Sequence, residues 1–390
     1  MIYMDHSATT PVDPRVVEAM QPFWSEAFGN PSSLHGAGRR AAAGLDDARQ
    51  RVAAILNCLP AEVVFTGCGT ESDNLALRGV GLAQAARGKR HIITTPIEHH
   101  AIIHTAAQLA EHFDFEVTYL PVDDDGLVDP AAVEAAIRPD TALISVMYAN
   151  NEVGTIEPLA EIGQIARRHD VPFHTDAVQA GGYLSLDVQA LNVDLLSLSA
   201  HKFYGPKGVG LLYVRRGVTL WPMQTGGGQE RGRRAGTENL PYIVGLARAL
   251  ELAQREAAVE GARLAGLRDC LVEGVRTRIP RARLSGHPSR RLPGHASFII
   301  PGAEANGLLI ALDLAGVAAS SGSACASGAA EPSHVLTALK YGYEEALSSL
   351  RLTLGHLTTK ADVDYVIEKL PPIVERLRGL DAADRPEKRA

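Results

Sequence analysis

Residues 193–202 read Val193-Asp194-Leu195-Leu196-Ser197-Leu198-Ser199-Ala200-His201-Lys202, and a turn, Phe203-Tyr204-Gly205-Pro206, follows them. The apolar run predicts a buried strand, and the Gly/Pro turn predicts that this strand ends at the lysine. A lysine there is expected in a desolvated pocket, where burial lowers the pKa of its amine and makes it a nucleophile and base near neutral pH. For Lys202 considered alone, a buried stem with a solvated amine is the simpler alternative.

A second predicted strand, residues 172–176, lies upstream and ends in the carboxylate of Asp176. A pyridoxal phosphate enzyme needs both groups, because an amine binds the cofactor covalently and an acid keeps the pyridine nitrogen protonated. Lys202 and Asp176 together therefore suggest pyridoxal phosphate as the cofactor.

Short β-rich runs alternate with helical patterns through the first half of the chain. We predict seven strands, at residues 62–65, 91–95, 116–120, 142–148, 172–176, 194–199 and 210–214. Helices are predicted between them at residues 72–86, 101–113, 130–137 and 158–169. This order is typical of an α/β fold with a mostly parallel sheet covered on both faces. Ligands of such sheets bind at the carboxyl ends of the strands.

The C-terminal third has a different pattern, in which a long helical stretch leads into shorter strands and a last helix. We expect an N-terminal arm (residues 1–15) that joins the small domain, a large cofactor-binding domain (residues 16–259) and a smaller α+β domain (residues 260–390). The small domain carries a loop of small residues at about 315–332.

Composition excludes several classes of protein. The 390 residues are 46% hydrophobic and 21% charged, as in an ordinary soluble enzyme. A net charge of −7 and a pI near 6.1 give no basic field for nucleic acid or anionic lipid. No signal peptide or membrane-spanning run is evident, and the four scattered cysteines form no CxxC pair. We expect a cytoplasmic protein with no fixed metal site and no nucleic-acid or membrane partner.

Polar groups follow the carboxyl ends of five predicted strands. After the first, Gly69 and Thr70 open a helix whose free N–H groups suit a phosphate. His99 can stack on a cofactor ring, and Asn150 and the next asparagine can donate to a phenolate or carboxylate oxygen. The turn and the histidine are weak signals alone, since each is more often structural. Convergence of all five strand ends on one edge of the sheet predicts a single cofactor site.

Three segments add a resemblance to a known family: His174-Thr175-Asp176-Ala177-Val178-Gln179, Ser197-Leu198-Ser199-Ala200-His201-Lys202 and Ser320-Ser321-Gly322-Ser323-Ala324-Cys325. They are similar to the signature segments of cysteine desulfurases of the NifS/IscS type, which are class V, fold-type I pyridoxal phosphate enzymes. The similarity runs from Tyr3-Met4-Asp5-His6-Ser7 through Arg234-Ala235-Gly236-Thr237-Glu238-Asn239 to Ser349-Leu350-Arg351. It covers nearly the whole chain.

The resemblance assigns roles to individual residues. The implied catalytic residues are Cys325, Lys202 and His99. The implied cofactor contacts are Gly69, Thr70, His99, Asn150, Asp176, Gln179, Ser199, His201 and Lys202, with Thr237 supplied by the second subunit of a homodimer. Asn150 and Arg351 are implied to bind the carboxylate of the substrate, L-cysteine, for which a guanidinium is suited.

Cys325 distinguishes this family from other class V enzymes. It stands in a run of small residues, which is expected to leave its thiol exposed and able to move. The resemblance, to the group with a long catalytic loop, implies that this thiol accepts the sulfur of L-cysteine as a persulfide and leaves L-alanine. The sulfur would pass to an acceptor such as an iron–sulfur scaffold protein, with Cys325 as a transient cluster ligand shared with that scaffold. Cys58, Cys68 and Cys270 fit the role of small buried residues better.

Related activities stay open at this point. A selenocysteine lyase would share almost every residue, and a class V aminotransferase would share the cofactor site without needing Cys325. A non-catalytic sulfur-relay scaffold is disfavoured, because the lysine, the acid and the thiol are all present. The sequence does not identify the physiological sulfur acceptor.

Overall fold

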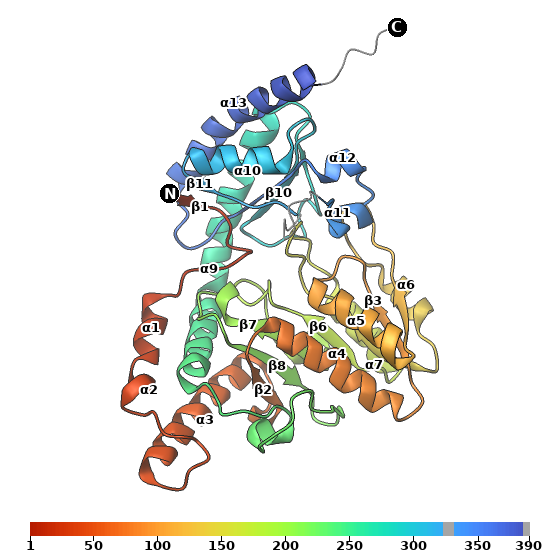
Figure 1. Ribbon diagram of the computed structural model, residues 1–390, viewed down its shortest axis with the longest axis vertical. Helices are drawn as coiled ribbons and strands as arrows, with labels where there is room; N and C mark the ends of the chain where they lie inside the picture. The colour runs from red at the N-terminus through yellow and green to blue at the C-terminus, as the bar shows by residue number, and fades with distance from the viewer. Residues whose placement is uncertain (323–330, 385–390) are drawn as a thin grey trace.

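The computed structural model describes residues 1–322 and 331–384. A long helix connects a part built on a seven-stranded sheet to a smaller C-terminal part (Figure 1). Cys325 lies outside the described residues.

The seven predicted strands are confirmed and form one sheet. Their order across the sheet is β2 (Val63–Thr66), β8 (Gly210–Val214), β7 (Leu195–Ser199), β6 (Phe173–Asp176), β5 (Thr141–Ser145), β3 (His91–Thr94) and β4 (Glu116–Tyr119). β8 runs antiparallel to β2 and β7, and the other neighbouring pairs are parallel. The predicted α/β class with a mostly parallel sheet is therefore confirmed.

Hydrophobic clusters cover both faces of the sheet. A single strand contributes to both clusters, because its side chains alternate between the two faces. Val64 joins a cluster with α4 (Gly69–Ala85) and α5 (His100–Phe113), whereas Val63 and Phe65 join the opposite cluster. The helices of that second cluster include α1 (Pro14–Met20), α3 (Gly36–Leu56), α7 (Leu159–Arg168) and the first half of α9 (Leu240–Arg278). Shorter helical elements complete this part: α2 (Pro22–Ser25), η1 (Pro60–Glu62), α6 (Pro130–Ala136), α8 (Val188–Leu191), η2 (Ala200–Lys202) and η3 (Gln229–Gly232).

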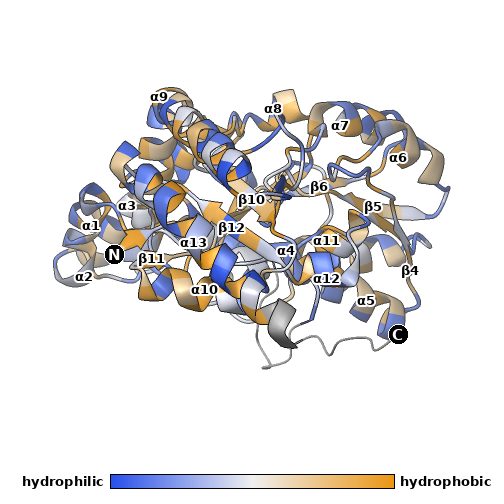
Figure 2. Cartoon of the chain, turned by 90° about the horizontal axis from the view of Figure 1, so that it is seen from above, coloured by the Kyte–Doolittle hydropathy of each residue, from blue (hydrophilic) through white to orange (hydrophobic). Residues whose placement is uncertain are grey.

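The C-terminal part has its own antiparallel sheet, in the order β12 (Ser349–Thr353), β10 (His295–Ile299) and β9 (Arg283–Leu284). The second half of α9, α10 (Ala305–Leu314) and α13 (Lys360–Asp384) pack around it, and α11 (His334–Ala338) and α12 (Tyr343–Ala346) lie before β12. β10 is coloured as largely hydrophobic, while α9 and α13 show both colours, as expected for helices with one buried face (Figure 2).

The N-terminal strand β1 (Ile2–Tyr3) pairs in parallel with β11 (Val317–Ala318), which precedes residues 323–330. The start of the chain thereby lies beside the C-terminal part (Figure 1). The expected boundary at residues 259/260 falls inside α9, which is continuous, so the domain division stays a prediction. In the part of the chain that the structure describes, no helix is long and apolar enough to cross a bilayer.

Candidate active site

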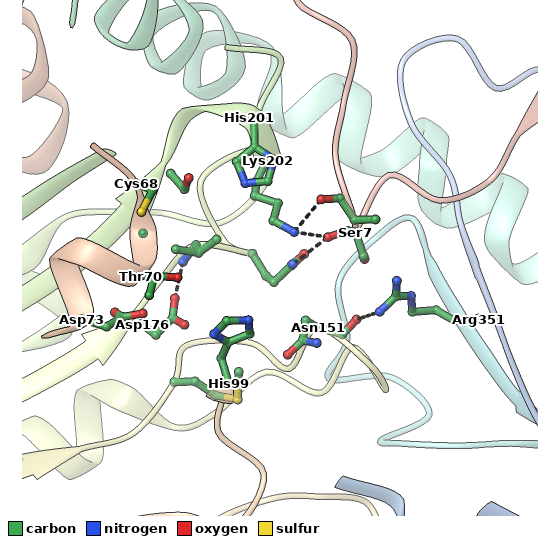
Figure 3. A pocket seen from close by; sticks show the side chains of 16 residues that line it. Ser7, Cys68, Thr70, Asp73, His99, Asn151, Asp176, His201, Lys202 and Arg351 are labelled. Atoms are coloured by element: carbon green, nitrogen blue, oxygen red, sulfur yellow. Dashed lines mark hydrogen bonds between the residues drawn. The ribbon is translucent and has the colours of Figure 1, made fainter. Parts of the chain in front are cut away.

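A cavity of about 310 Å³ lies at the carboxyl ends of the central strands (Figure 3). Nine residues predicted for the site line it: Gly69, Thr70, His99, Asp176, Gln179, Ser199, His201, Lys202 and Arg351. Segments far apart in the sequence therefore meet at one edge of the sheet, as the strand order requires. No group of three or more His, Cys, Asp or Glu side chains among the described residues is arranged to hold a metal ion.

Lys202 enters the cavity from η2, directly after β7, whose five residues are all buried. Its Nζ donates to the carbonyl oxygens of Ser7 and Ala8, the latter at 2.9 Å. Burial and, after it, repulsion from the Arg351 guanidinium lower the pKa of this amine to about 8, against the attraction of Asp176. The amine is thus less basic than an exposed lysine, as predicted from the sequence.

Asp176 ends β6 inside the cavity. Its Oδ1 accepts a hydrogen bond from Val178 N at 2.8 Å, and the residue is only 6% exposed. Burial raises the pKa of this carboxyl, while nearby His99 and Lys202 act to lower it. A buried carboxylate of this kind is stabilised by a cation placed next to it, such as a protonated ring nitrogen.

His99 caps the N-terminus of α5, and its Nδ1 accepts a hydrogen bond from Ala101 N at 3.1 Å. Because Nδ1 is an acceptor, Nε2 carries the proton of the neutral ring and is the nitrogen left to exchange protons. His99 lines the cavity in the same region as Asp176 (Figure 3).

The N-terminus of α4 forms an anion-binding site, which is called here the phosphate cup. Gly69 and Thr70 begin the helix, where backbone N–H groups lack intrahelical acceptors. A Cβ at residue 69 would lie 2.8 Å from Val178 Cγ2 and 3.3 Å from Ser199 Cβ. Glycine at this position therefore keeps the space at the N-terminus of α4 open. The pKa of His201 is lowered to about 4, first by burial and then by Lys202, which keeps its ring neutral at pH 7.

Arg351, in the middle of β12, closes the opposite side of the cavity. Its guanidinium donates to Asp5 Oδ1 and to the carbonyl oxygen of Asn151, each at 3.0 Å, and its side chain is 9% exposed. These two contacts orient the guanidinium toward the cavity, where it can bind a carboxylate. Sequence reasoning missed Asp5 as the partner, and missed the carbonyls of Ser7 and Ala8, although all three stand in the N-terminal segment that carries the resemblance.

Asn150 does not line the cavity, unlike its neighbour Asn151. The Asn150 side chain is fully buried: its Oδ1 accepts from Glu152 N and Val153 N, and its Nδ2 donates to the carbonyl oxygen of Ile97 and to Met147 Sδ. These bonds build the turn and leave the amide no capacity for a ligand. The cofactor and substrate contacts predicted for Asn150 therefore need correction, and we propose Asn151 for them.

Thr237 is also outside the cavity. It is exposed in the segment between β8 and α9, where it lines a separate hollow together with Gly67 and Arg234. Its predicted contact with the site of a second subunit stays a prediction.

Comparisons with known proteins agree with this geometry. The sequence model of the aminotransferase class V family matches residues 2–366. The chain belongs to the class V aminotransferase family. Among curated members of the family, it is 51% identical over 379 residues to cysteine desulfurase IscS of Methanosarcina thermophila, covering 97% of this chain and 93% of that protein. It is 49% identical over 379 residues to cysteine desulfurase IscS of Dictyoglomus turgidum, covering 97% and 96%.

Solved structures of this class V family confirm the fold-type I prediction. A NifS-like protein superposes with a TM-score of 0.90 at 39% identity, over 96% of this chain and 99% of that one. A NifS-like protein from Rickettsia africae gives 0.86 at 32% identity, over 96% and 99%. SspA in complex with cysteine gives 0.80 at 38% identity, over 91% and 99%. Within the class V family the chain therefore groups with the NifS/IscS-type cysteine desulfurases, as its sequence predicts.

Proposed function

We propose that the protein is a pyridoxal phosphate-dependent cysteine desulfurase, which converts L-cysteine to L-alanine and takes the sulfur onto Cys325. The observation that carries the proposal is the pairing of a lysine of lowered pKa with a buried carboxylate in one cavity, Lys202 with Asp176. The relatives named as cysteine desulfurases support it, as does the neighbour described in complex with cysteine.

The residues present fit pyridoxal phosphate. Gly69 and Thr70 offer a phosphate the open cup at the start of α4, beside Ser199 and His201, and Asp176 offers a protonated ring nitrogen its counter-charge. Gln179 lines the same cavity, where its Nε2 donates to Ser7 O and has a second N–H that can be donated to a ring oxygen. When bound, pyridoxal phosphate supplies an electron-withdrawing ring that stabilises negative charge at the α-carbon of an amino acid.

The side chains around that carbon divide the work of binding and proton transfer. The Arg351 guanidinium and the Asn151 amide hold the substrate carboxylate, which orients the α-carbon toward Lys202. The Lys202 amine, with its pKa of about 8, removes the α-proton and later returns one. His99, which lines the same cavity, is the second group that carries protons, through its Nε2.

Sulfur transfer then belongs to Cys325. Its thiolate attacks the sulfur of the substrate, so that an S–S bond forms as the C–S bond breaks. The electron pair of the broken bond stays with the carbon, which takes up protons and leaves as alanine. The step needs no outside oxidant or reductant, because the carbon skeleton is reduced as the transferred sulfur is oxidised.

The proposal extends to the setting of the enzyme. We infer a cytoplasmic homodimer in which Thr237 of each subunit reaches the phosphate cup of the other. The persulfide passes to an acceptor of the iron–sulfur scaffold type, with Cys325 as a transient cluster ligand during transfer.

Two variants test the proposal, because the two nucleophiles act on different atoms. Lys202→Ala should lose the visible absorbance of the lysine-bound cofactor and form no alanine from L-cysteine. Cys325→Ala should keep the absorbance but form no persulfide. Sulfide release by Cys325→Ala at the wild-type rate would contradict the assignment. Keto-acid-dependent amino exchange without sulfur release would indicate an aminotransferase, and preferential turnover of selenocysteine would indicate a lyase.

A further inference from the structure

One buried carboxylate outside the cavity, that of Glu152, contacts Gly322 and Ser333. These two residues are the ends of what is called here the Cys325 segment, residues 322–333. Glu152 is 6% exposed and follows directly on the asparagine pair of the active-site turn. The described residues Gly322 and Ser333 flank residues 323–330 on their two sides, and both lie against the Glu152 side chain.

On the C-terminal side, the contact is a hydrogen bond. Ser333 Oγ donates to Glu152 Oε2 and accepts from Val335 N and Leu336 N, at 3.1 and 3.3 Å, as the N-cap of α11. The serine hydroxyl therefore joins the first turn of α11 to the carboxylate. Because Ser333 is itself 4% exposed, water competes little for this bond.

On the N-terminal side, the contact is a close approach of backbone. A Cβ at residue 322 would lie 2.6 Å from Glu152 Oε2 and 3.4 Å from Ser333 Cβ. Glycine at this position lets the chain pass directly over the carboxylate and beside the serine. The preceding backbone is fixed to β12, since Ser320 and Arg351 exchange hydrogen bonds of 2.7 and 3.2 Å between their N–H and carbonyl groups.

The same turn reaches the substrate side of the site. Asn150 Oδ1 accepts from Glu152 N at 2.8 Å, and the carbonyl oxygen of Asn151 accepts from Arg351 at 3.0 Å. Three consecutive residues thus do three jobs: Asn150 shapes the turn, Asn151 meets the guanidinium proposed to bind substrate, and Glu152 holds the ends of the Cys325 segment.

We propose that Glu152 is a positioning residue for sulfur transfer, which holds the two ends of the Cys325 segment together beside the turn that contacts Arg351. The inference rests on the proposed role of Cys325 as sulfur acceptor. Fixing the ends of a segment restricts its conformations, and this lowers the entropic cost of bringing the thiol to the substrate sulfur. The pKa of Glu152 is raised to about 7, because burial outweighs the Ser333 hydroxyl and the charge of Arg351, which both lower it.

The first test separates the two halves of the reaction in Glu152→Ala. The absorbance of the bound cofactor and its change on adding L-cysteine should match the wild type, because Glu152 does not line the cavity. Persulfide formation on Cys325, followed by mass spectrometry in a single turnover, should slow about tenfold or more, since the thiol is no longer positioned. Glu152→Gln keeps an acceptor for Ser333 Oγ and should stay within about threefold of the wild type.

Glu157→Ala is the matched control. Glu157 is a second buried carboxyl, 3% exposed, whose Oε2 accepts from Val128 N, far from residues 322 and 333 in its contacts. Burial likewise raises its pKa, to about 8. A general loss of core stability would slow both alanine variants equally, whereas positioning slows only Glu152→Ala.

Two substitutions of Ser333 keep the inference testable if Glu152→Ala does not fold. Ser333→Asp retains an N-cap acceptor for α11 but cannot donate to Glu152, and it places a second negative charge there. Ser333→Thr retains the hydroxyl. We expect slow persulfide formation with normal cofactor spectra in the first and near wild-type rates in the second. Wild-type rates in Ser333→Asp or Glu152→Ala would overturn the inference, whereas absence of any persulfide on wild-type Cys325 would overturn the proposed function instead.

Discussion

The pKa of Lys202 is lowered because this residue follows directly on the buried strand β7. A buried strand and a tight 3-10 turn place the amine beside the N-terminal segment, where the carbonyl oxygens of Ser7 and Ala8 accept its hydrogen bonds. Desolvation is the largest cause of the shift, and the Arg351 guanidinium adds repulsion. The sequence predicts the burial, because the apolar run and the turn are local.

The pH dependence of cofactor attachment tests this environment. Only the neutral amine can bond to the aldehyde of pyridoxal phosphate, so attachment to cofactor-free protein should quicken as pH rises through about 8 and level off above it. An ordinary lysine, with a pKa near 10.5, would give rates that still rise about tenfold per unit between roughly pH 8 and 9.5. Stopped-flow absorbance after adding pyridoxal phosphate measures the rate, and such a continuing rise would contradict the buried position.

Residue-scale detail sets the limit of prediction from sequence. Asn150 and Asn151 have the same side chain and adjacent positions, so composition and spacing cannot tell which one enters the cavity. The conformation of the turn determines which one does, because the Asn150 amide is hydrogen-bonded to the backbone of Glu152, Val153 and Ile97. The bond from Arg351 to Asp5 joins residues at opposite ends of the chain, and no local pattern indicates it.

At the scale of elements, a buried ion pair fixes the segment that carries Thr237. Arg49 of α3 donates to Glu230 Oε1 at 2.7 Å, and the two side chains are 6% and 2% exposed. Glu230 Oε2 also accepts from Phe65 N at 3.1 Å, and Arg49 donates to the carbonyl oxygen of Val63 at 2.7 Å. The pair thus joins α3, β2 and the segment between β8 and α9.

Removing the cation should destabilise the fold strongly. Arg49→Met keeps an apolar stem but leaves the Glu230 carboxylate buried and unpaired, and we expect the free energy of unfolding to fall by about 3–5 kcal/mol. Arg51→Met is the control on the same helix, since its pair with Asp47 is exposed and contributes less than about 1 kcal/mol. Urea denaturation of both variants measures the difference, and equal small losses would contradict the role given to the buried pair.

Element-scale predictions from sequence succeed where periodicity is strong. All seven strands of the large sheet are confirmed, because their apolar runs are bounded by turn residues. The tie between α3 and Glu230 was not predicted, since it joins residues 181 positions apart in the chain. Long-range charge pairing of this kind leaves no periodic signal.

At the scale of the whole molecule, our proposal is that each site borrows Thr237 from a second chain, since this residue is exposed and lies outside the cavity of its own chain. Mixing an impaired variant with an inactive one tests this directly. Thr237→Val should weaken cofactor binding, and Lys202→Ala should abolish alanine formation. A dimer of one subunit of each kind has one site with an intact lysine and an intact partner threonine, so unfolding and refolding the mixture should restore activity. No restoration in verified mixed dimers would show that Thr237 does not act across subunits.

The division of work between Lys202 and Cys325 is the central claim, and the mass of the cysteine-containing peptides after adding L-cysteine to the holoenzyme tests it most directly. The rival thiol is Cys68, which lines the cavity but is fixed as the N-cap of α4, where its Sγ accepts from Glu71 N at 3.4 Å. We expect one added sulfur atom on Cys325, removable by a thiol reductant, and none on Cys58, Cys68 or Cys270. Added sulfur on Cys68 with none on Cys325, or alanine formed with no sulfur on any cysteine, would contradict it.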